Sequence, residues 1–495
     1  MLVKPSYPGV YIQEVPSGVR TISGVSTSVA AFVGWAPRGP ADVAVRCLGW
    51  ADYERVFGGL DARGLLAYAV QQFFFNGGGE CFVIRLAGPG DKPATAMLDG
   101  LEVQAKGPGT WAHAYQLVAT PQADDPERFR LDIVDEATGA IVESHADLAL
   151  GTTDARCAEK VLDASHILKV TKADETRPVT AKTIALAGGQ DGEPLAPGDA
   201  EFGTALFGDG VTSGVHALKK VDLYNLLNVP GYTDAAKLAE LAKMCRDKRA
   251  FLLVDSDKDT EPGGPRMTGG PDPRLTGEDG VNAAYYYPWL MMPDPKQAGS
   301  PRAFPPGGAV AGMFARTDAT RGVWKTPAGT DATLNGVIDV TLPTTERESG
   351  VLNPLAVNCI RRFPGKGILV WGARTLRGRD EAASEWKYVP VRRTALFIEE
   401  SLFRGLQWVV FEPNDEPLWA QIRLNVGAFM HNLFRQGAFQ GTSPRDAYFV
   451  KCDRETTTQN DINLGIVNII VGFAPLKPAE FVIIKIRQLA GQHSV

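Results

Sequence analysis

The residue types that most often carry chemistry lie scattered along this chain. No two of the six histidines have the spacing of a metal-binding pair on a helix, so the sequence indicates no helical metal site. The closest two cysteines, Cys47 and Cys81, are 34 residues apart, which excludes the paired spacing of a zinc site. We therefore expect surface or hydrogen-bonded histidines and buried thiols.

Two short segments resemble ion-binding or phosphate-binding motifs but lack residues that those motifs require. Residues 255–259 could begin a calcium loop, yet Thr260 stands where an EF-hand needs glycine and Arg266 where it needs glutamate. Residues 364–367 resemble the end of a phosphate loop, but no serine or threonine follows Lys366. Neither segment is expected to bind a ligand.

The glycines at 307, 308 and 312 do not form a dinucleotide-binding motif, and we expect a loop there. The sequence also contains no G-x-S-x-G nucleophile elbow. We therefore predict no catalytic, cofactor-binding or metal-binding residue, and no cofactor. In a chain of this length, that result favours binding or self-assembly over catalysis.

Length and composition narrow the class further. The chain has 495 residues, which at ~150 residues per domain predicts two to four domains. A net charge of −6 argues against nucleic acid as the main partner, because binding a phosphate backbone requires a basic surface. The chain shows neither the ~20-residue apolar run of a membrane helix nor the apolar core of a signal peptide, so we expect synthesis in the cytosol.

The first 90 residues show an α/β pattern. The apolar runs 29–34 and 81–86 indicate buried strands, and the apolar spacing from Leu65 to Phe75 predicts a helix between them. A strand, a helix and a strand in this order predict parallel pairing of the two strands.

The same pattern returns after residue 200. Strands are predicted over 222–229, 251–255 and 368–371, and a helix over 235–247 with Thr233 as its N-cap. Residues 261–310 contain 19 glycines and prolines, so we expect mainly loop there. Residues 25–90 and 200–375 are therefore predicted to form one split α/β sheet domain.

The intervening residues, 91–199, are interpreted as an inserted β-rich domain. Segments 129–133 and 141–144 flank a turn signal at 135–139, which predicts a hairpin. Residues 121–200 carry 16 acidic and 8 basic side chains, so this part of the chain is markedly acidic.

The last part, residues 376–495, is predicted to be a separate C-terminal α+β domain. Asn414 or Asp415 can cap a helix that has Pro417 in its first turn. Gly437 is expected to end this helix. Five apolar residues recur every three or four positions along it and form one stripe: Leu418, Ile422, Val426, Phe429 and Leu433.

Two β-forming segments lie at the ends of the chain, where no neighbouring segment offers an obvious partner. An isolated strand leaves backbone groups unpaired, so each must pair within its own domain or add to a sheet of another copy. The N-terminal segment consists of Val10, Tyr11, Ile12, Gln13, Glu14 and Val15. It lies within residues 1–24, which are interpreted as an arm and a linker. The C-terminal segment consists of Phe481, Val482, Ile483, Ile484, Lys485 and Ile486.

Charge is also segregated along the chain. Residues 361–410 carry a net charge of +5, whereas residues 121–200 carry −8. Opposite patches on one chain suit head-to-tail contacts between copies or an acidic partner, although two ordinary solvated faces would look the same.

Several strings of sequence, in a consistent order, carry a family resemblance. They include YPGVYIQEVPSG at 7–18 and QWVVFEPNDEPLW at 407–419, with further strings at 26–34, 286–289, 315–324, 353–354, 370–375, 388–393, 459–461 and 477–481. The chain resembles the contractile tail sheath proteins of phages, R-type pyocins and extracellular contractile injection systems. Residues 91–190 carry the least resemblance, which fits a family whose outer domain varies.

The resemblance implies a structural subunit and not an enzyme. Sheath subunits polymerise as stacked hexameric rings around an inner tube and contract to drive that tube through a target envelope, without ATP hydrolysis by the sheath. In this family, terminal arms of neighbouring subunits add strands to the C-terminal domain of another subunit. Here those arms would be residues 10–15 and 481–487.

The resemblance also implies partners and a location. The partners would be other copies of the chain, an inner tube protein, and baseplate and tail-terminator proteins, with no nucleic acid and no direct membrane insertion. Candidates to face the tube are Arg423, His431 and Arg435 on the predicted helix. The subunit would assemble in the cytoplasm of the producing bacterium and become part of a virion tail or of a released or anchored contractile particle.

Two alternatives stay open at this point. The α/β pattern alone would also suit an enzyme, hydrolase-like or nucleotide-binding, of unknown substrate. Another tail component is a further alternative, although tube proteins are usually much shorter. Within the sheath family, the sequence does not distinguish a phage tail from a bacteriocin or an extracellular injection system.

Overall fold

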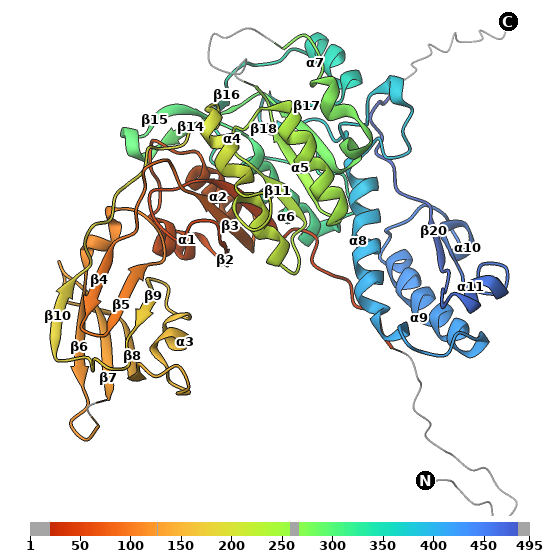
Figure 1. The fold of residues 1–495 in the computed structure, drawn as a ribbon. Helices are drawn as coiled ribbons and strands as arrows, with labels where there is room; N and C mark the ends of the chain where they lie inside the picture. The colour runs from red at the N-terminus through yellow and green to blue at the C-terminus, as the bar shows by residue number, and fades with distance from the viewer. Residues whose placement is uncertain (1–19, 126, 258–266, 484–495) are drawn as a thin grey trace, which may run out of the picture. The chain divides into compact units, whose positions relative to one another are not determined.

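A computed structural model describes residues 20–125, 127–257 and 267–483. These residues form two compact units within a multidomain α/β fold, the class predicted from the sequence (Figure 1). The central unit combines Ser26–Arg321 with Thr326–Arg392. The C-terminal unit combines the described parts of Met1–Val25, Gly322–Lys325 and Arg393–Val495.

The central unit is built on an eight-stranded sheet with the order β18-β17-β13-β12-β11-β1-β3-β2. The six inner strands pair in parallel, whereas β2 and β18 at the edges pair antiparallel with their neighbours. The predicted parallel pairing of the first two strands of the α/β pattern is therefore confirmed. The strands are β1 (Ala30–Trp35), β2 (Ala44–Cys47), β3 (Cys81–Leu86), β11 (Leu226–Asn228), β12 (Phe251–Asp255), β13 (Ala283–Tyr287), β17 (Val357–Phe363) and β18 (Gly367–Val370).

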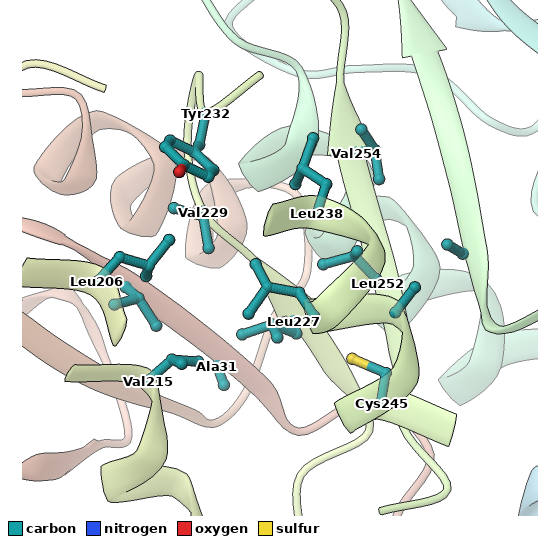
Figure 2. Packing of buried hydrophobic residues seen from close by; sticks show 14 of the residues in the cluster. Ala31, Leu206, Val215, Leu227, Val229, Tyr232, Leu238, Cys245, Leu252 and Val254 are labelled. Atoms are coloured by element: carbon teal, nitrogen blue, oxygen red, sulfur yellow. The ribbon is translucent and has the colours of Figure 1, made fainter. Parts of the chain in front are cut away.

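The inner strands are recognisable in the sequence because they are buried on both faces. Every residue of β1 and of β12 is buried, so each strand is a nearly continuous apolar run without polar alternation. Figure 2 shows the hydrophobic core of the unit, in which side chains from strands pack against side chains from a helix. Ala31, Leu227, Leu252 and Cys245 are among the packed side chains.

Helices α2 and α6 approach each other closely beside this sheet. A Cβ on Gly308 would lie 2.3 Å from the carbonyl oxygen of Ala69, and one on Gly312 would lie 2.3 Å from that of Phe73. The predicted loop at 307–312 is therefore wrong, because the glycines serve close helix packing despite their low helix propensity. The helices that belong to the unit outside its inserted lobe are α1 (Trp50–Phe57), α2 (Leu66–Phe75), α4 (Ala200–Phe207), α5 (Ala235–Asp247), α6 (Gly307–Arg321) and α7 (Glu346–Leu352).

Two other local predictions need correction. The described part of 261–310 is not mainly loop, because it contains β13 and a hairpin of β14 (Leu290–Asp294) and β15 (Ser300–Phe304), which β16 (Asp339–Val340) completes as a small sheet. Its glycines and prolines lie at the ends of short strands, and the composition of the segment does not reveal strands of that length. The N-cap of α5 is Asp234 and not Thr233, since its carboxylate accepts the backbone N–H of Lys237 at 3.0 Å.

Between β3 and α4 the chain forms an inserted β-rich lobe with a core of its own (Figure 1). The predicted hairpin is confirmed as β7 and β8. A Cβ on Gly192 would lie 2.7 Å from the carbonyl oxygen of Gly88, so the chain enters and leaves the lobe at one place. The lobe contains β4 (Thr95–Leu98), β5 (Leu101–Ala105), β6 (Tyr115–Pro121), β7 (Arg128–Asp135), β8 (Ile141–Ala149), α3 (Ala158–Leu162), β9 (Leu168–Ala173) and β10 (Lys182–Ala185).

The C-terminal unit packs helices against a two-stranded sheet. Asp415 caps α9 by accepting the backbone N–H of Leu418, and Gly437 follows the helix with a φ of 79°, as predicted. All five residues of the predicted stripe are buried. The elements are α8 (Val389–Gly405), whose first four residues belong to the central unit, α9 (Glu416–Arg435), α10 (Pro444–Ala447), β19 (Tyr448–Lys451), α11 (Gln459–Asn463) and β20 (Ile470–Phe473).

Among the described helices of either unit, none is both long enough and apolar enough to cross a bilayer.

Candidate assembly interface

The residues considered first for chemistry do not converge on a site. The six cysteines are buried and free. Over residues 20–125, 127–257 and 267–483, no group of three or more histidine, cysteine, aspartate or glutamate side chains is placed to hold a metal ion. Residues 364–367 lie where the antiparallel strands β17 and β18 meet.

Asp255, the first residue of the calcium-like segment, has a structural role. Its carboxylate accepts the backbone N–H of Gly307 at 2.7 Å, the N–H of Gly231 at 3.0 Å and the side-chain amide of Asn228 at 3.2 Å. Burial raises the pKa of Asp255 to about 6, although these three hydrogen bonds oppose the rise. The residue therefore joins β12 to α6 and to the loop after β11.

The C-terminal unit instead presents an unfinished sheet. Strands β19 and β20 pair antiparallel, with Tyr448 opposite Phe473 and Lys451 opposite Ile470. Among the described residues this sheet has two strands, and just beyond β20 an isolated antiparallel bridge pairs Phe439 with Pro475, so most of the length of the sheet has no third strand beside it. An open edge offers unpaired backbone N–H and C=O groups to an added strand.

An apolar groove lies between α8 and the segment that contains β20. It encloses about 350 Å³, with Leu402, Phe403 and Leu406 of α8 on one side and Ile469 and Val471 on the other. Phe403 is 54% exposed and Ile470 48% exposed, although both are large and apolar. An incoming strand with apolar side chains on one face could pair with the edge and fill the groove.

The predicted terminal arms lie partly within the described chain. Phe481, Val482 and Ile483 are 74%, 80% and 81% exposed and belong to no strand. Ile484, Lys485 and Ile486 lie outside the described residues, as do Val10, Tyr11, Ile12, Gln13, Glu14 and Val15.

The three predicted tube-facing residues on α9 differ in their surroundings. Arg423 forms an ion pair with Glu416 at 2.6 Å and also donates to the backbone carbonyl of Cys452. His431 and Arg435 are exposed, and so is Leu424 on the same helix. The structure therefore separates one arginine that is used inside the unit from two polar side chains that face solvent.

The loop before α9 contains a residue whose backbone conformation could not be predicted from the sequence. Phe411 has a φ of 71° and is fully exposed, and Val410 beside it is 58% exposed. A bulky residue at positive φ is a backbone outlier, which residue type alone would not suggest. The only sequence signal is that Phe411 lies within the string 407–419 that carries the family resemblance.

Comparison with known proteins identifies this architecture. Residues 217–376 match the phage tail sheath protein central domain, and residues 381–488 match the phage tail sheath C-terminal domain. The chain belongs to the phage tail sheath family. The open sheet β19–β20, its groove and helix α9 all lie within the sheath C-terminal domain.

A named relative supports the same family. A protein of Pseudomonas aeruginosa (strain UCBPP-PA14), named as a prophage major tail sheath protein, is 25% identical over 203 residues, or 39% of this chain. The match spans about half of that relative, 49% of its length.

Solved sheath assemblies resemble almost the whole chain. The anti-feeding prophage helical sheath in its contracted state is 26% identical with a TM-score of 0.61, covering 98% of this chain and 99% of that one. A chain of the anti-feeding prophage baseplate is 25% identical with a TM-score of 0.59, covering 98% and 99%. These likenesses and the family favour a structural sheath subunit over the α/β enzyme.

Proposed function

We propose that this chain polymerises as stacked hexameric rings around an inner tube and contracts to drive the tube through a target envelope. The observation that carries the proposal is the open β19–β20 sheet beside its apolar groove. A two-stranded sheet is marginally stable by itself, and its unpaired edges favour strands supplied by other copies. The sheath family and the likeness to a contracted sheath support the same function.

The donated strands are the terminal arms, residues 10–15 and 481–486. The exposure of Phe481, Val482 and Ile483 supports this role, because these large apolar side chains contact little of their own unit. Backbone pairing suits a contractile lattice, since a donated strand can stay hydrogen-bonded while the linkers beside it allow the folded units to rotate.

The exposed part of α9 is the candidate surface for the inner tube. Arg435 and His431 are available there for an acidic tube surface, whereas Arg423 is engaged with Glu416. We keep Arg423, His431 and Arg435 as the proposed set, with Arg423 acting through the stability of the helix.

The wider proposal follows from that role. The four-part organisation is a terminal arm at 1–24, a split α/β domain at 25–90 and 200–375, an inserted outer domain at 91–199 and an assembly domain at 376–495. The partners are other copies, the inner tube protein, and baseplate and tail-terminator proteins. Assembly takes place in the cytoplasm of the producing bacterium, and the product is a virion tail or a released or anchored contractile particle.

Negative-stain electron microscopy tests this function directly. The chain is expressed alone and together with an inner tube protein. We expect cylinders or stacks of rings, with the tube inside when both proteins are present. Dispersed globules under both conditions would contradict the proposal.

A further inference from the structure

The two cysteines that are closest in the sequence, Cys47 and Cys81, face each other in the structure. Strand β2 pairs antiparallel with β3, and in that register Cys47 lies directly opposite Cys81. Both residues are 0% exposed, so both side chains lie on the buried face of the sheet. Because they are 34 positions apart in the sequence, no short motif reveals that they are neighbours.

This arrangement meets the geometric requirements of a disulfide. Residues directly opposite in an antiparallel pair have Cα atoms about 4.5–5.5 Å apart, and disulfides join residues whose Cα atoms are about 4.4–6.8 Å apart. The side chains of Cys47 and Cys81 are already hydrogen-bonding neighbours. Small rotations of the two side chains should therefore bring the sulfur atoms into bonding range without a large movement of the backbone.

Contacts beside the pair hold the two strands in this register. Arg46, next to Cys47, forms an ion pair with Glu80, next to Cys81, and the joined atoms are 2.6 Å apart. The antiparallel pairing extends over all four residues of β2. The two thiols are thus presented to each other by the fold itself and need no further partner to meet.

The location of β2 gives a small oxidant a route to the buried thiols. The strand lies at the edge of the described sheet and pairs there with β3 alone. A short edge strand opens locally at a lower free-energy cost than an inner strand. Burial raises the pKa of Cys81 well above its ordinary range, and the neighbouring Cys47 adds to the rise, so we expect slow reaction in the closed sheet and faster reaction on opening.

The other four cysteines are not arranged as a second pair of this kind. Cys157 precedes α3, Cys245 lies in α5, Cys359 lies in β17 and Cys452 follows β19. Cys359, the other cysteine within a strand, lies opposite Tyr287 in the pairing of β17 with β13. Within the described strand pairings, Cys47 and Cys81 are therefore the pair placed for a cross-strand bond.

We propose that Cys47 and Cys81 form a reversible cross-strand disulfide that fastens the edge strand β2 to β3 when the chain meets an oxidant of the hydroperoxide class. The inference goes beyond the proposed sheath function and does not depend on it, because it concerns the central unit of a single chain.

Hydrogen peroxide is the simplest oxidant of that class, and the reaction balances with it. The thiolate of one cysteine attacks an oxygen of the peroxide, the O–O bond breaks, and a sulfenic acid forms while the leaving hydroxide takes up a proton to become water. The thiolate of the other cysteine attacks the sulfenic sulfur, so the S–S bond forms and the S–O bond breaks with release of a second water. The two sulfur atoms together lose two electrons, which the peroxide oxygens gain.

Mass spectrometry of the folded full chain tests the pairing. Unassembled chain is exposed to hydrogen peroxide at a dose that fully oxidises a reference peptide with an exposed cysteine, and is then unfolded, alkylated and digested. We expect two alkylated cysteines fewer than the six of the reduced chain, and one linked peptide that joins Cys47 to Cys81. Dithiothreitol should restore all six, because thiol exchange reduces a disulfide but not a sulfinic acid.

Three outcomes would overturn the inference: six remaining thiols, a disulfide between any other two cysteines, or sulfinic acid at Cys47 or Cys81 in place of the linked peptide. Cys47→Ser should retain all five of its thiols under the same exposure. Cys359→Ser is the matched control at another buried cysteine, and it should lose two of its five. If either variant fails to fold, the linked peptide of the wild-type chain decides the question by itself.

Thermal unfolding tests whether the bond fastens the strand. The oxidised wild-type chain should melt at least about 3 °C above the same sample reduced with dithiothreitol, because the bond closes the loop from residue 47 to residue 81 in the unfolded chain. Cys47→Ser should melt at the same temperature after either treatment. An unchanged or lower melting temperature of the oxidised wild type would contradict the fastening of β2.

Discussion

The Nη2 atom of Arg423 lies 2.6 Å from Oε1 of Glu416, seven residues earlier on helix α9. The same guanidinium donates to the carbonyl of Cys452, directly after β19. Arg423 therefore fastens α9 to the small sheet. An arginine used in this way differs functionally from Arg435, which is exposed and, within the described residues, forms no ion pair.

We expect Arg423→Ala to lower the stability of the C-terminal unit without a specific effect on tube binding. Removing a half-buried ion pair and its backbone contact should reduce the free energy of unfolding by about 1–2 kcal/mol. Urea denaturation measures the loss, and co-sedimentation with tube protein under native conditions checks that binding is kept. A stable variant that no longer grips the tube would reverse our assignment of Arg423.

Charge reversal at the exposed end of α9 should have the opposite effect. His431→Glu with Arg435→Glu is expected to leave folding and sheath assembly intact but to reduce co-purification of the tube at least about tenfold, because these side chains face solvent. Arg445→Glu on α10, another exposed arginine, is the matched control. Unchanged co-purification with the double variant would exclude this face of α9.

Asp255 should make stability depend on pH. Its folded-state pKa of about 6 exceeds its value of ~3.9 in an unfolded chain, so its stabilising contribution is complete below pH 4 and is lost as the pH rises through 6. This difference in pKa corresponds to about 3 kcal/mol in the free energy of unfolding. Urea unfolding of unassembled chain from pH 4 to 7 should show this decline in wild type relative to Asp255→Asn, and parallel pH profiles would contradict it.

The packing of α2 against α6 can be tested with two glycines. Gly308→Ala should destabilise the central unit by more than about 2 kcal/mol, since its Cβ would lie 2.3 Å from the Ala69 carbonyl oxygen. Gly350→Ala, in helix α7 with no atom within 4 Å of its added Cβ, should be neutral or stabilise by up to about 1 kcal/mol. Melting temperatures of the two variants measure the contrast, which disappears if α6 does not rest on α2.

Deleting residues 1–16 should abolish sheath polymerisation while leaving a folded, monomeric chain. The reason is that the deletion removes the predicted N-terminal strand but no described core residue. Size-exclusion chromatography and negative-stain microscopy check the outcome. Sheaths of normal length from the truncated chain would exclude an essential role of that arm.

Features governed by local periodicity could be predicted from the sequence. Strands β1 and β12 are visible because burial on both faces leaves uninterrupted apolar runs, and α9 because its stripe follows the helical repeat. The beginning of α6 at Gly307 could not be predicted, since it depends on the close approach of α2. The loop before α9 could not be predicted either, since the residue type of Phe411 does not suggest its positive φ and Asn414 bonds to Ile466, 52 residues later in the sequence.

The residues of the candidate interface also differ in how far the sequence could predict them. The arm segments were predicted from their strand-forming composition, and their pairing stays a prediction. The engagement of Arg423 with Cys452 could not be predicted, because it joins residues 29 positions apart through the tertiary fold.

The inserted lobe has its own hydrophobic core, and its two connections pass side by side at Gly88 and Gly192. A domain attached in this manner can be exchanged without changing the ends that the scaffold must bridge. Changes within residues 91–190 can therefore be accommodated without altering the part of the central unit to which the lobe is attached. The same position is also suited to protein engineering. A foreign domain whose two termini lie as close together as the two connections of the lobe could replace it for display.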